Sequence, residues 1–189
     1  TTEMKPVTSS IKPHYIQLYK HYEQAQARTR DALVISDEGN LNLDNMYWDV
    51  EVESVTDSAM VVFDHIWSAP DAIKDFDHKP YTLSSYHYWK VSGLDVENVE
   101  LSGQFFYDGR PGGNTGYLDM DLASVQEDSL VLLYRIDAHD DWEENEAYEK
   151  NILGSSDNGF GLITLDVIVS GEYTLANLDH SALSASQPS

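Results

Sequence analysis

Histidine is the side chain in this sequence that could most readily bind a metal or carry out acid–base catalysis near neutral pH. The seven histidines are His14, His21, His65, His78, His87, His139 and His180. None of them belongs to an H-E-x-x-H motif of the kind found in zinc proteases, and the chain has no cysteine to serve as a thiolate ligand or nucleophile. His65 and His87 lie on apolar segments next to Trp67 and Trp89, which predicts partly buried, hydrogen-bonded structural residues.

Carboxylates are numerous enough to raise the question of a calcium site, because calcium takes about six to eight oxygen ligands. Acidic residues cluster at Asp75 and Asp77, at Asp119 and Asp121, and at Asp137, Asp140 and Asp141. The last set is our candidate for a structural calcium ion; the alternative is a solvated surface, since clusters arise by chance in so acidic a chain. No carboxylate pair is marked out for glycoside hydrolysis, and no Gly-x-Ser-x-Gly element is present.

Five aromatic residues occur around a long predicted loop at residues 68–85. They are Trp67, Tyr81, Tyr86, Tyr88 and Trp89. If they are exposed together, they would form a platform for stacking sugar rings, as in a carbohydrate-binding module. The alternative is that they belong to the core, because aromatic side chains of β-strands contribute much of a core's buried area. We therefore predict no catalytic residue, and no cofactor other than the calcium candidate.

The net charge is −22. A surface of this charge repels nucleic acid and anionic membranes, so neither is an expected partner, and no apolar run is long enough to predict a membrane span. The charge is uneven: the first 30 residues hold five basic and two acidic residues, a net charge of +3, which leaves −25 for the rest. This asymmetry indicates that residues 1–30 are a separate element.

Residues 1–30 are predicted to form a linker and one amphipathic helix. The helical spacing i, i+3, i+4, i+7 is carried by Tyr15, Leu18, Tyr19 and Tyr22. Arg28 and Arg30 suit the C-terminal end of that helix, where the helix dipole favours positive charge. Residues 180–189 are small and polar and are predicted to be a disordered tail.

Residues 31–179 are predicted to form a β domain. The expected strands cover residues 32–35, 48–55, 59–67, 86–94, 99–107, 129–136, 160–170 and 172–176. Residues 48–55 alternate strictly, with Asp49, Glu51 and Glu53 facing solvent, and residues 86–94 are expected to be a central strand. Arg135, at the far end of its strand, is expected to pair with a carboxylate.

Two pairs of strands are expected to form hairpins, namely residues 48–55 with 59–67 and residues 160–170 with 172–176. The glycine-rich residues 108–116 are expected to be a surface loop that does not lead into a helix. Together these features predict an antiparallel β-sandwich of immunoglobulin-like general type with one N-terminal helix. A closed barrel is the alternative.

Several short motifs resemble one known family. They are Trp48-Asp-Val-Glu-Val-Glu-Ser-Val-Thr-Asp-Ser-Ala59, His65-Ile-Trp-Ser-Ala-Pro-Asp71, Tyr88-Trp-Lys-Val-Ser-Gly93, Phe105-Phe-Tyr107, Leu132-Leu-Tyr-Arg135 and Gly171-Glu-Tyr-Thr-Leu-Ala176. The pattern is similar to the C-terminal β-sandwich region of secreted bacterial zinc metallopeptidases of the gluzincin, or aminopeptidase N-like, family. That family's H-E-x-x-H and Gly-x-Met-x-Asn motifs do not occur here, so no catalytic residue is carried over.

The resemblance implies a non-catalytic accessory domain with a structural or positioning role, located outside the cell or in the periplasm. Its partner would be an upstream catalytic domain of the same polypeptide, and residues 1–30 would connect the two. Two alternatives remain open: a carbohydrate-binding β-sandwich module and a calcium-stabilised adhesion-type domain.

Overall fold

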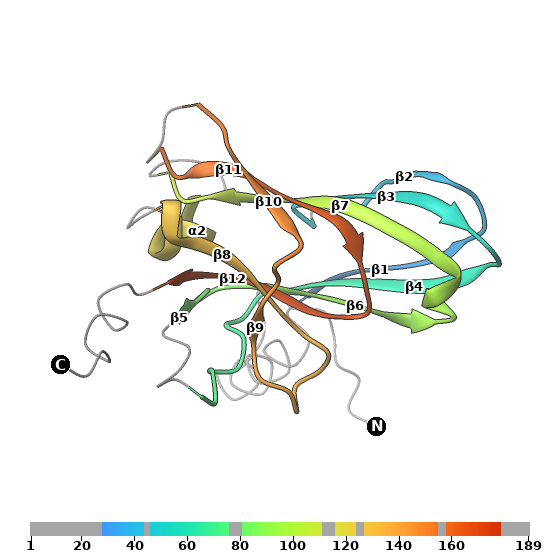
Figure 1. Cartoon of the computed structure of the whole chain (residues 1–189), viewed down its shortest axis with the longest axis horizontal. Helices are drawn as coiled ribbons and strands as arrows, with labels where there is room; N and C mark the ends of the chain where they lie inside the picture. Colours follow the sequence, from blue (N-terminus) through green and yellow to red (C-terminus); the bar gives the residue numbers. More distant parts are fainter. Residues whose placement is uncertain are drawn as a thin grey trace, which may run out of the picture.

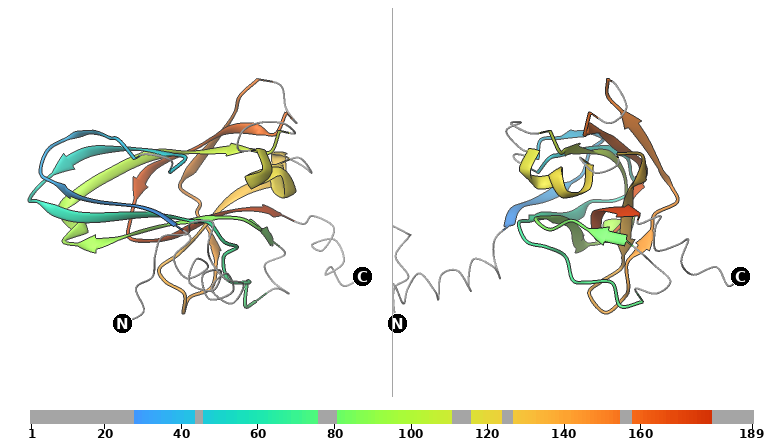
Figure 2. Two further views of the ribbon diagram at one scale, coloured as in Figure 1. Left: turned by 180° about the vertical axis from the view of Figure 1, so that it is seen from behind. Right: turned by 90° about the vertical axis from the view of Figure 1, so that its left-hand side faces the viewer.

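The computed structural model describes residues 28–43, 46–75, 81–110, 116–123, 127–154 and 158–178. These residues form two antiparallel β-sheets that lie face to face, with one short helix at one end (Figures 1 and 2). The hydrogen bonds of the described strands divide them into two sheets instead of closing a single barrel, so the predicted sandwich-like, all-β architecture is confirmed. The helix predicted N-terminal to Arg28 and the tail predicted after residue 179 lie outside the described residues.

The larger sheet has seven strands. Its spatial order is β1 (Arg28–Ile35), β4 (Ala59–Ile66), β6 (Tyr88–Leu94), β12 (Gly171–Leu178), β8 (Leu130–Arg135) and β9 (Glu143–Glu144), and β5 (Tyr81–Leu83) also pairs with β12. The five-stranded sheet has the order β10 (Tyr148–Ile152), β11 (Phe160–Ile168), β7 (Val99–Asp108), β3 (Trp48–Val55) and β2 (Gly39–Leu41). The predicted central strand is therefore confirmed as β6, which lies inside the larger sheet.

The main core fills the space between the two sheets. On β3, Trp48 is buried while Asp49, Glu51 and Glu53 are exposed, as the alternation predicts. The Trp48 ring stacks on Phe105 of β7 with ring centroids 4.3 Å apart. Fully buried aromatic side chains of this kind contribute the most apolar area per residue, so they dominate the stability of the sandwich.

Both predicted hairpins are wrong. β3 pairs with β2 and β7, whereas β4 pairs with β1 and β6, so the turn between β3 and β4 crosses from one sheet to the other. In the same way β11 belongs to the five-stranded sheet and β12 to the seven-stranded sheet. Alternation of apolar and polar residues shows which side of a strand is buried, but it is the same for a hairpin and for a crossing between sheets.

The second crossing is built around Gly171 and Tyr173. Gly171 has a φ angle of +150°, and a Cβ atom there would lie 2.3 Å from the Tyr134 ring, so only glycine fits. The Tyr173 hydroxyl accepts a hydrogen bond from the Val169 N–H at 2.9 Å and donates one to the Val169 carbonyl at 2.8 Å. These contacts fix the corner where the chain changes sheets.

Two further predictions need correction. β1 begins at Arg28, so Arg28 and Arg30 lie in an edge strand and not at the end of a helix. The glycine-rich residues 108–116 do lead into a helix, α2 (Gly116–Ala123), which packs against β7 and β12. Short 3₁₀ turns, η1 (Val96–Asn98) and η2 (Glu127–Ser129), precede β7 and β8.

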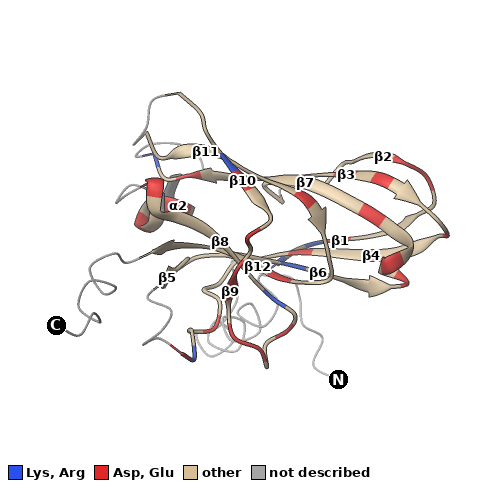
Figure 3. Ribbon diagram, in the orientation of Figure 1, with Lys and Arg blue, Asp and Glu red and all other residues tan. Residues whose placement is uncertain are grey.

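A row of charged residues with alternating sign crosses the outer face of the larger sheet, and we call it the ion ladder. Its members, on five neighbouring strands, are Arg30, Asp64, Lys90, Glu172 and Arg135. Each one stands directly opposite the next in the strand register. By contrast, the charged positions of β3 in the other sheet are all acidic (Figure 3), and the residues concerned are exposed.

The ladder is exposed at one end and buried at the other. The Arg30 side chain is 44% exposed, whereas the Arg135 side chain is 1% exposed and lies 2.6 Å from Glu172, which confirms its predicted carboxylate partner. Trp142 covers this end, with the Arg135 guanidinium 4.2 Å from its ring centroid. Trp142 belongs to a small second core on the outer face, together with Val131 and Leu133 of β8.

Candidate functional site

The five aromatic residues of the predicted platform do not come together. Trp89 is fully buried in the main core and its indole N–H donates to the Met46 carbonyl at 2.8 Å. Tyr88, its neighbour on β6, points to the opposite face of the sheet and packs edge-on against Trp142.

The other three differ in burial and in hydrogen-bond partners, although Tyr81 packs against the same small second core as Tyr88. Trp67 donates to Thr29 of the edge strand, Tyr81 donates to Glu144, and Tyr86 is 45% exposed. Alternate residues of a strand face opposite sides, so adjacent aromatics cannot form one platform.

The three aspartates of the predicted calcium site also do not converge. Asp137 accepts hydrogen bonds from the backbone and ring of His139. The Asp141 carboxylate accepts from the backbone N–H groups of Lys74 and Asp75, at 2.9 and 3.0 Å. Among the residues that the structure describes, no group of three or more His, Asp or Glu side chains is arranged to hold a metal ion.

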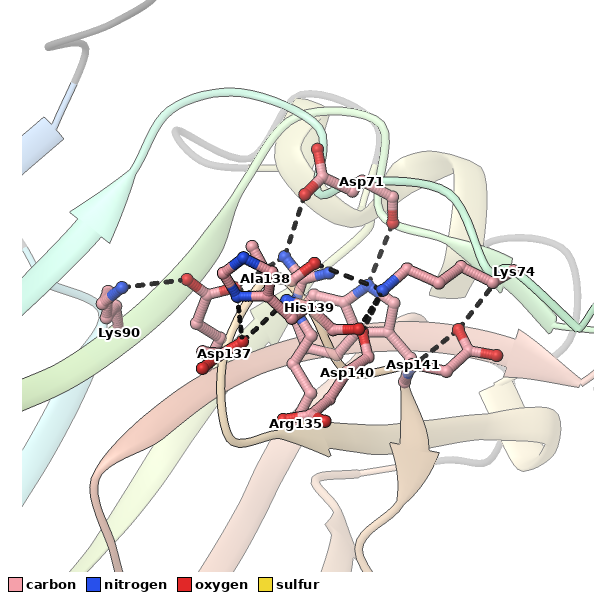
Figure 4. Close-up of polar contacts among 11 residues, drawn as sticks. Asp71, Lys74, Lys90, Arg135, Asp137, Ala138, His139, Asp140 and Asp141 are labelled. Atoms are coloured by element: carbon pink, nitrogen blue, oxygen red, sulfur yellow. Dashed lines mark hydrogen bonds and ion pairs between the residues drawn. The ribbon is translucent and has the colours of Figure 1, made fainter.

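The loop that carries these aspartates contacts a positively charged side chain of the protein itself, that of Lys74. Three consecutive carbonyls, of Ala138, His139 and Asp140, accept hydrogen bonds from the Lys74 ammonium at 3.3, 2.5 and 3.0 Å (Figure 4). An ammonium group has three N–H donors, so Lys74 matches these three acceptors. The contact clasps the segment after β4 to the loop after β8, beside the buried end of the ion ladder.

A pocket of about 300 Å³ with both apolar and charged lining residues lies at the end of the sandwich where α2 packs. Its apolar walls are Tyr47, Phe106, Leu118 and Phe160. Its polar lining residues are His87, Asp108, Arg110 and Asp119. An aromatic-walled pocket with a few fixed polar groups is the usual form of a small-molecule site.

A buried chain of hydrogen bonds runs from the core to this pocket, and we call it the histidine chain. His65 Nε2 lies 2.8 Å from His87 Nδ1, and His87 Nε2 lies 2.9 Å from the Asp119 carboxylate. All three side chains are buried, with His65 and His87 no more than 1% exposed. Both histidines are hydrogen-bonded, as predicted, and each is more deeply buried than expected.

The partners of the chain define which nitrogens carry protons. An ionised carboxylate only accepts hydrogen bonds, so Asp119 accepts from His87 Nε2–H, and its other oxygen accepts from the Asp108 backbone N–H at 2.9 Å. His87 Nδ1 is then the acceptor for His65 Nε2–H. Neither nitrogen of His87 is left over for a substrate, so the chain is suited to holding the pocket wall rather than to acid–base catalysis.

Arg110 is held rigidly at the mouth of the pocket. Its Nε and one terminal nitrogen donate to the two carboxylate oxygens of Asp108, both at 2.9 Å, and its guanidinium lies 3.9 Å from the Phe160 ring centroid. The hydrogen bonds that Arg110 donates to Asp108 raise the pKa of Arg110 above its ordinary value. The remaining guanidinium N–H groups are in a fixed geometry and can donate to a ligand.

Tyr47 forms another wall and has a strained backbone. Its φ angle is +53°, a left-handed conformation that costs a non-glycine residue about 1–3 kcal/mol. The ring meets His65 and Trp67 edge-on, with centroids 5.7 and 6.0 Å away. Such strain is maintained only where the surroundings hold it, and it concentrates at functional sites.

Sequence reasoning missed most of this pocket. Asp119 was considered only as one of several calcium candidates, and Tyr47 and Arg110 were not considered as site residues. The Asp-Gly-Arg sequence at residues 108–110 could have indicated a turn that brings an arginine back onto an aspartate. The distance between His87 and Asp119 in the sequence gives no sign that they meet.

Comparisons of this chain with protein-family models, with curated proteins and with solved structures found no match. The resemblance to the aminopeptidase family therefore stays a prediction. Within the described part of the chain, no helix has the length and apolar character needed to cross a membrane.

Proposed function

We propose that this chain is a non-catalytic binding domain that holds a carbohydrate residue in the pocket between Tyr47 and Phe160. The observation that supports this proposal is the combination of aromatic walls with a fixed arginine–aspartate pair at the mouth. The pocket volume of about 300 Å³ suits one small ring better than a long ligand.

The lining matches the chemistry of a sugar. The apolar faces of a sugar ring pack on aromatic side chains, and its hydroxyl groups both donate and accept hydrogen bonds. Arg110 supplies donors, and the Asp108 carboxylate that holds it balances its charge, so a neutral ligand meets no net charge from this pair. Since Asp108 and Phe160 already hold Arg110 in place, little side-chain entropy is lost on binding.

Removal of Arg110 tests the proposal. We expect the wild-type protein to bind defined members of a glycan array, and Arg110→Ala to reduce affinity for the best of them at least about tenfold, as calorimetry would measure. Arg30→Ala is a matched control, because Arg30 makes the same two-point contact with Asp64, at 2.7 and 2.8 Å, away from the pocket lining. Absence of binding to every glycan, or equal binding by Arg110→Ala and wild type, would contradict the proposal.

A second proposal is that the chain is an accessory domain of a secreted bacterial zinc aminopeptidase, with a structural or positioning role. The supporting observation is that residues of the quoted motifs, among them Trp48, Trp89 and Tyr173, meet in one core, as expected of motifs that specify a fold. The purified chain should not cleave aminoacyl-nitroanilides when zinc is added. Zinc-dependent turnover by this chain alone would exclude a purely accessory role.

The finer fold type also remains a proposal. The two hydrogen bonds of the Tyr173 hydroxyl to Val169 are similar to the tyrosine corner of immunoglobulin-type sandwiches, in which a tyrosine near the start of a strand bonds to the backbone a few residues upstream. This feature supports the immunoglobulin-like general type.

A further inference from the structure

Strand β1 forms one edge of the seven-stranded sheet, because among the described strands it pairs only with β4. An edge strand presents backbone N–H and C=O groups to which another strand can add. We propose that a second copy of this chain adds there, so that the two β1 strands pair antiparallel and the two larger sheets become continuous. The proposal is independent of the pocket and of its ligand.

The length and regularity of β1 set it apart from the other described edge strands. Those strands, β9, β2, β5 and β10, have two to five residues, whereas β1 has eight. Proteins commonly protect a sheet edge by a short strand, a proline or a β-bulge. β1 contains no proline, and its register with β4 is continuous from Arg28 to Ile35. It can therefore accept a complete neighbouring strand.

An apolar row extends from β1 across the outer face of the sheet. Val34, Met60 and Leu94 stand directly opposite one another on β1, β4 and β6, and they are 75, 40 and 63% exposed. Ala32 is exposed on the same face of β1 and stands opposite Val62. Contiguous exposed apolar residues of this kind mark protein–protein interfaces, since covering them removes apolar surface from water.

The charges along β1 identify the partner as a second copy in antiparallel orientation. Arg28 and Arg30 lie at the start of the strand, and Asp37 and Glu38 follow its end. Antiparallel pairing of two identical strands brings the start of each beside the end of the other. Opposite charges then meet at both ends of the interface, which favours the pairing, whereas a parallel arrangement would place like charges side by side.

One register of this pairing suits both the charges and the apolar row. When Leu33 lies opposite Leu33 of the second copy, Ala32 faces Val34, so the apolar row of each copy continues into the other. A shift by two residues in one direction would set Asp31 opposite Asp37, and like charges directly opposite each other are destabilising. The same shift in the other direction would set an arginine against the apolar row.

Sedimentation equilibrium of the complete chain tests the interface. The net charge of −22 on each copy opposes association, so the measurement is made at about 0.15 M salt, where charges more than about 8 Å apart are largely screened. We expect the average mass to rise towards twice that of one chain between about 1 μM and about 1 mM protein. A wild-type protein that stays monomeric over this range would overturn the proposal.

Two exposed valines provide a matched pair of variants. Val34→Lys places a charge next to the two-fold axis and should raise the dissociation constant of the dimer at least about tenfold. Val167→Lys is the control, because Val167 is 61% exposed but belongs to β11 of the other sheet, and it should change the constant less than about twofold. Equal effects of the two substitutions would overturn the assignment of the interface to β1.

An exchange of charges tests the register. Arg28 of one copy faces Glu38 of the other, so Arg28→Glu and Glu38→Arg should each weaken the dimer, and the double variant should restore it to within about threefold of wild type. The two residues lie at opposite ends of β1, about 20 Å or more apart within one chain, so recovery requires contact between copies. A double variant that dimerises no better than either single variant would overturn the register.

Hydrogen exchange of the wild type gives a readout that needs no substitution. Amides of β1 that point away from β4 should be protected at high protein concentration and not at low concentration, whereas those that point towards β4 should be protected at both. Dimerisation without this change in β1 would overturn the proposed strand pairing.

Discussion

The ion ladder and the histidine chain share strand β4 but lie on opposite faces of its sheet. On β4, Asp64 belongs to the ladder on the outer face, and the next residue, His65, belongs to the histidine chain inside the sandwich. Alternate residues of a strand point to opposite faces, so one strand supplies a member to each arrangement.

The two arrangements differ in the kind of polar group they contain. The ladder is a row of acidic and basic side chains, each directly opposite a charge of the other sign in the strand register. The histidine chain consists of two imidazoles and one carboxylate that hydrogen-bond to one another. We infer that the ladder contributes mainly to stability, while the histidine chain holds the wall of the pocket that His87 and Asp119 line.

Removal of a charge at the buried end of the ion ladder should have the largest effect on the free energy of unfolding. Glu172→Gln leaves Lys90 and the buried Arg135 without their shared carboxylate, and loss of one partner of a buried ion pair costs about 3–5 kcal/mol. Urea denaturation would measure this as a loss in the free energy of unfolding. The double variant Arg135→Met/Glu172→Leu should recover much of the loss, because no charge is left unpaired. A loss below about 1 kcal/mol for Glu172→Gln would mean that water reaches this end.

Interruption of the histidine chain should have an intermediate effect on the free energy of unfolding. Asp119→Ala leaves two buried donors, His87 Nε2–H and the Asp108 backbone N–H, without their acceptor, which costs about 1–3 kcal/mol. The variant should also bind glycan more weakly at neutral pH, since His87 and Asp108 both line the pocket. Unchanged stability would indicate that water replaces the carboxylate and that the chain is not a buried unit.

The eight strands predicted from the sequence match observed strands to within a few residues, but their partners were not predictable, and the shorter strands β2, β5, β9 and β10 were missed. Residues 48–55 match β3 because alternation is a local signal. The pairing of β3 with β7, more than 40 residues away along the chain, depends on packing of the whole core. Helix α2 was missed because it has only eight residues and follows a glycine-rich loop, although Leu118 and Leu122 have helical spacing.

The candidate site was predictable only in part. Apolar neighbours correctly indicated that His65 and His87 are buried and hydrogen-bonded. His65 bonds to His87, 22 residues away, and His87 bonds to Asp119, 32 residues further on. These two contacts depend on strand register and on the position of α2, which the sequence does not show. The aromatic platform was a different kind of error, because alternation along β6 already separates Tyr88 from Trp89.

Loss of the Lys74 contact with the loop after β8 should reduce stability less than the changes above. The effect should be confined to the loop beside the buried end of the ion ladder. Lys74→Met removes three hydrogen bonds to exposed carbonyls, and we expect a loss of about 0.5–1.5 kcal/mol. Hydrogen exchange should rise in residues 137–142 and not in the histidine chain. Calcium should not restore the protection, since the aspartates of this loop do not converge. Restoration by calcium would revive the predicted metal site.

Alkaline pH should produce the smallest effect on stability, and this effect should come from partly buried tyrosines and not from Arg30 of the ion ladder. The ladder's Arg30 keeps its charge, because its hydrogen bonds with Asp64 raise its pKa above the ordinary value. Tyrosine hydroxyls behave differently: burial, and then the nearby Glu144, raise the pKa of Tyr81 to about 12, and burial also raises the pKa of Tyr107 and Tyr173.

The direction of the resulting pH dependence follows from these tyrosines. A tyrosine whose pKa is raised by folding ionises first in the unfolded chain, so its contribution is complete below about pH 10 and is lost as the pH rises towards the folded-state value. Lys150 acts in the opposite direction, because burial lowers its pKa and its deprotonation favours the folded state. We expect the free energy of unfolding to fall between about pH 10 and 12, and to fall less in Tyr81→Phe than in Tyr86→Phe, which replaces an exposed tyrosine. An equal fall in the two variants would show that Tyr81 is solvated in the native state.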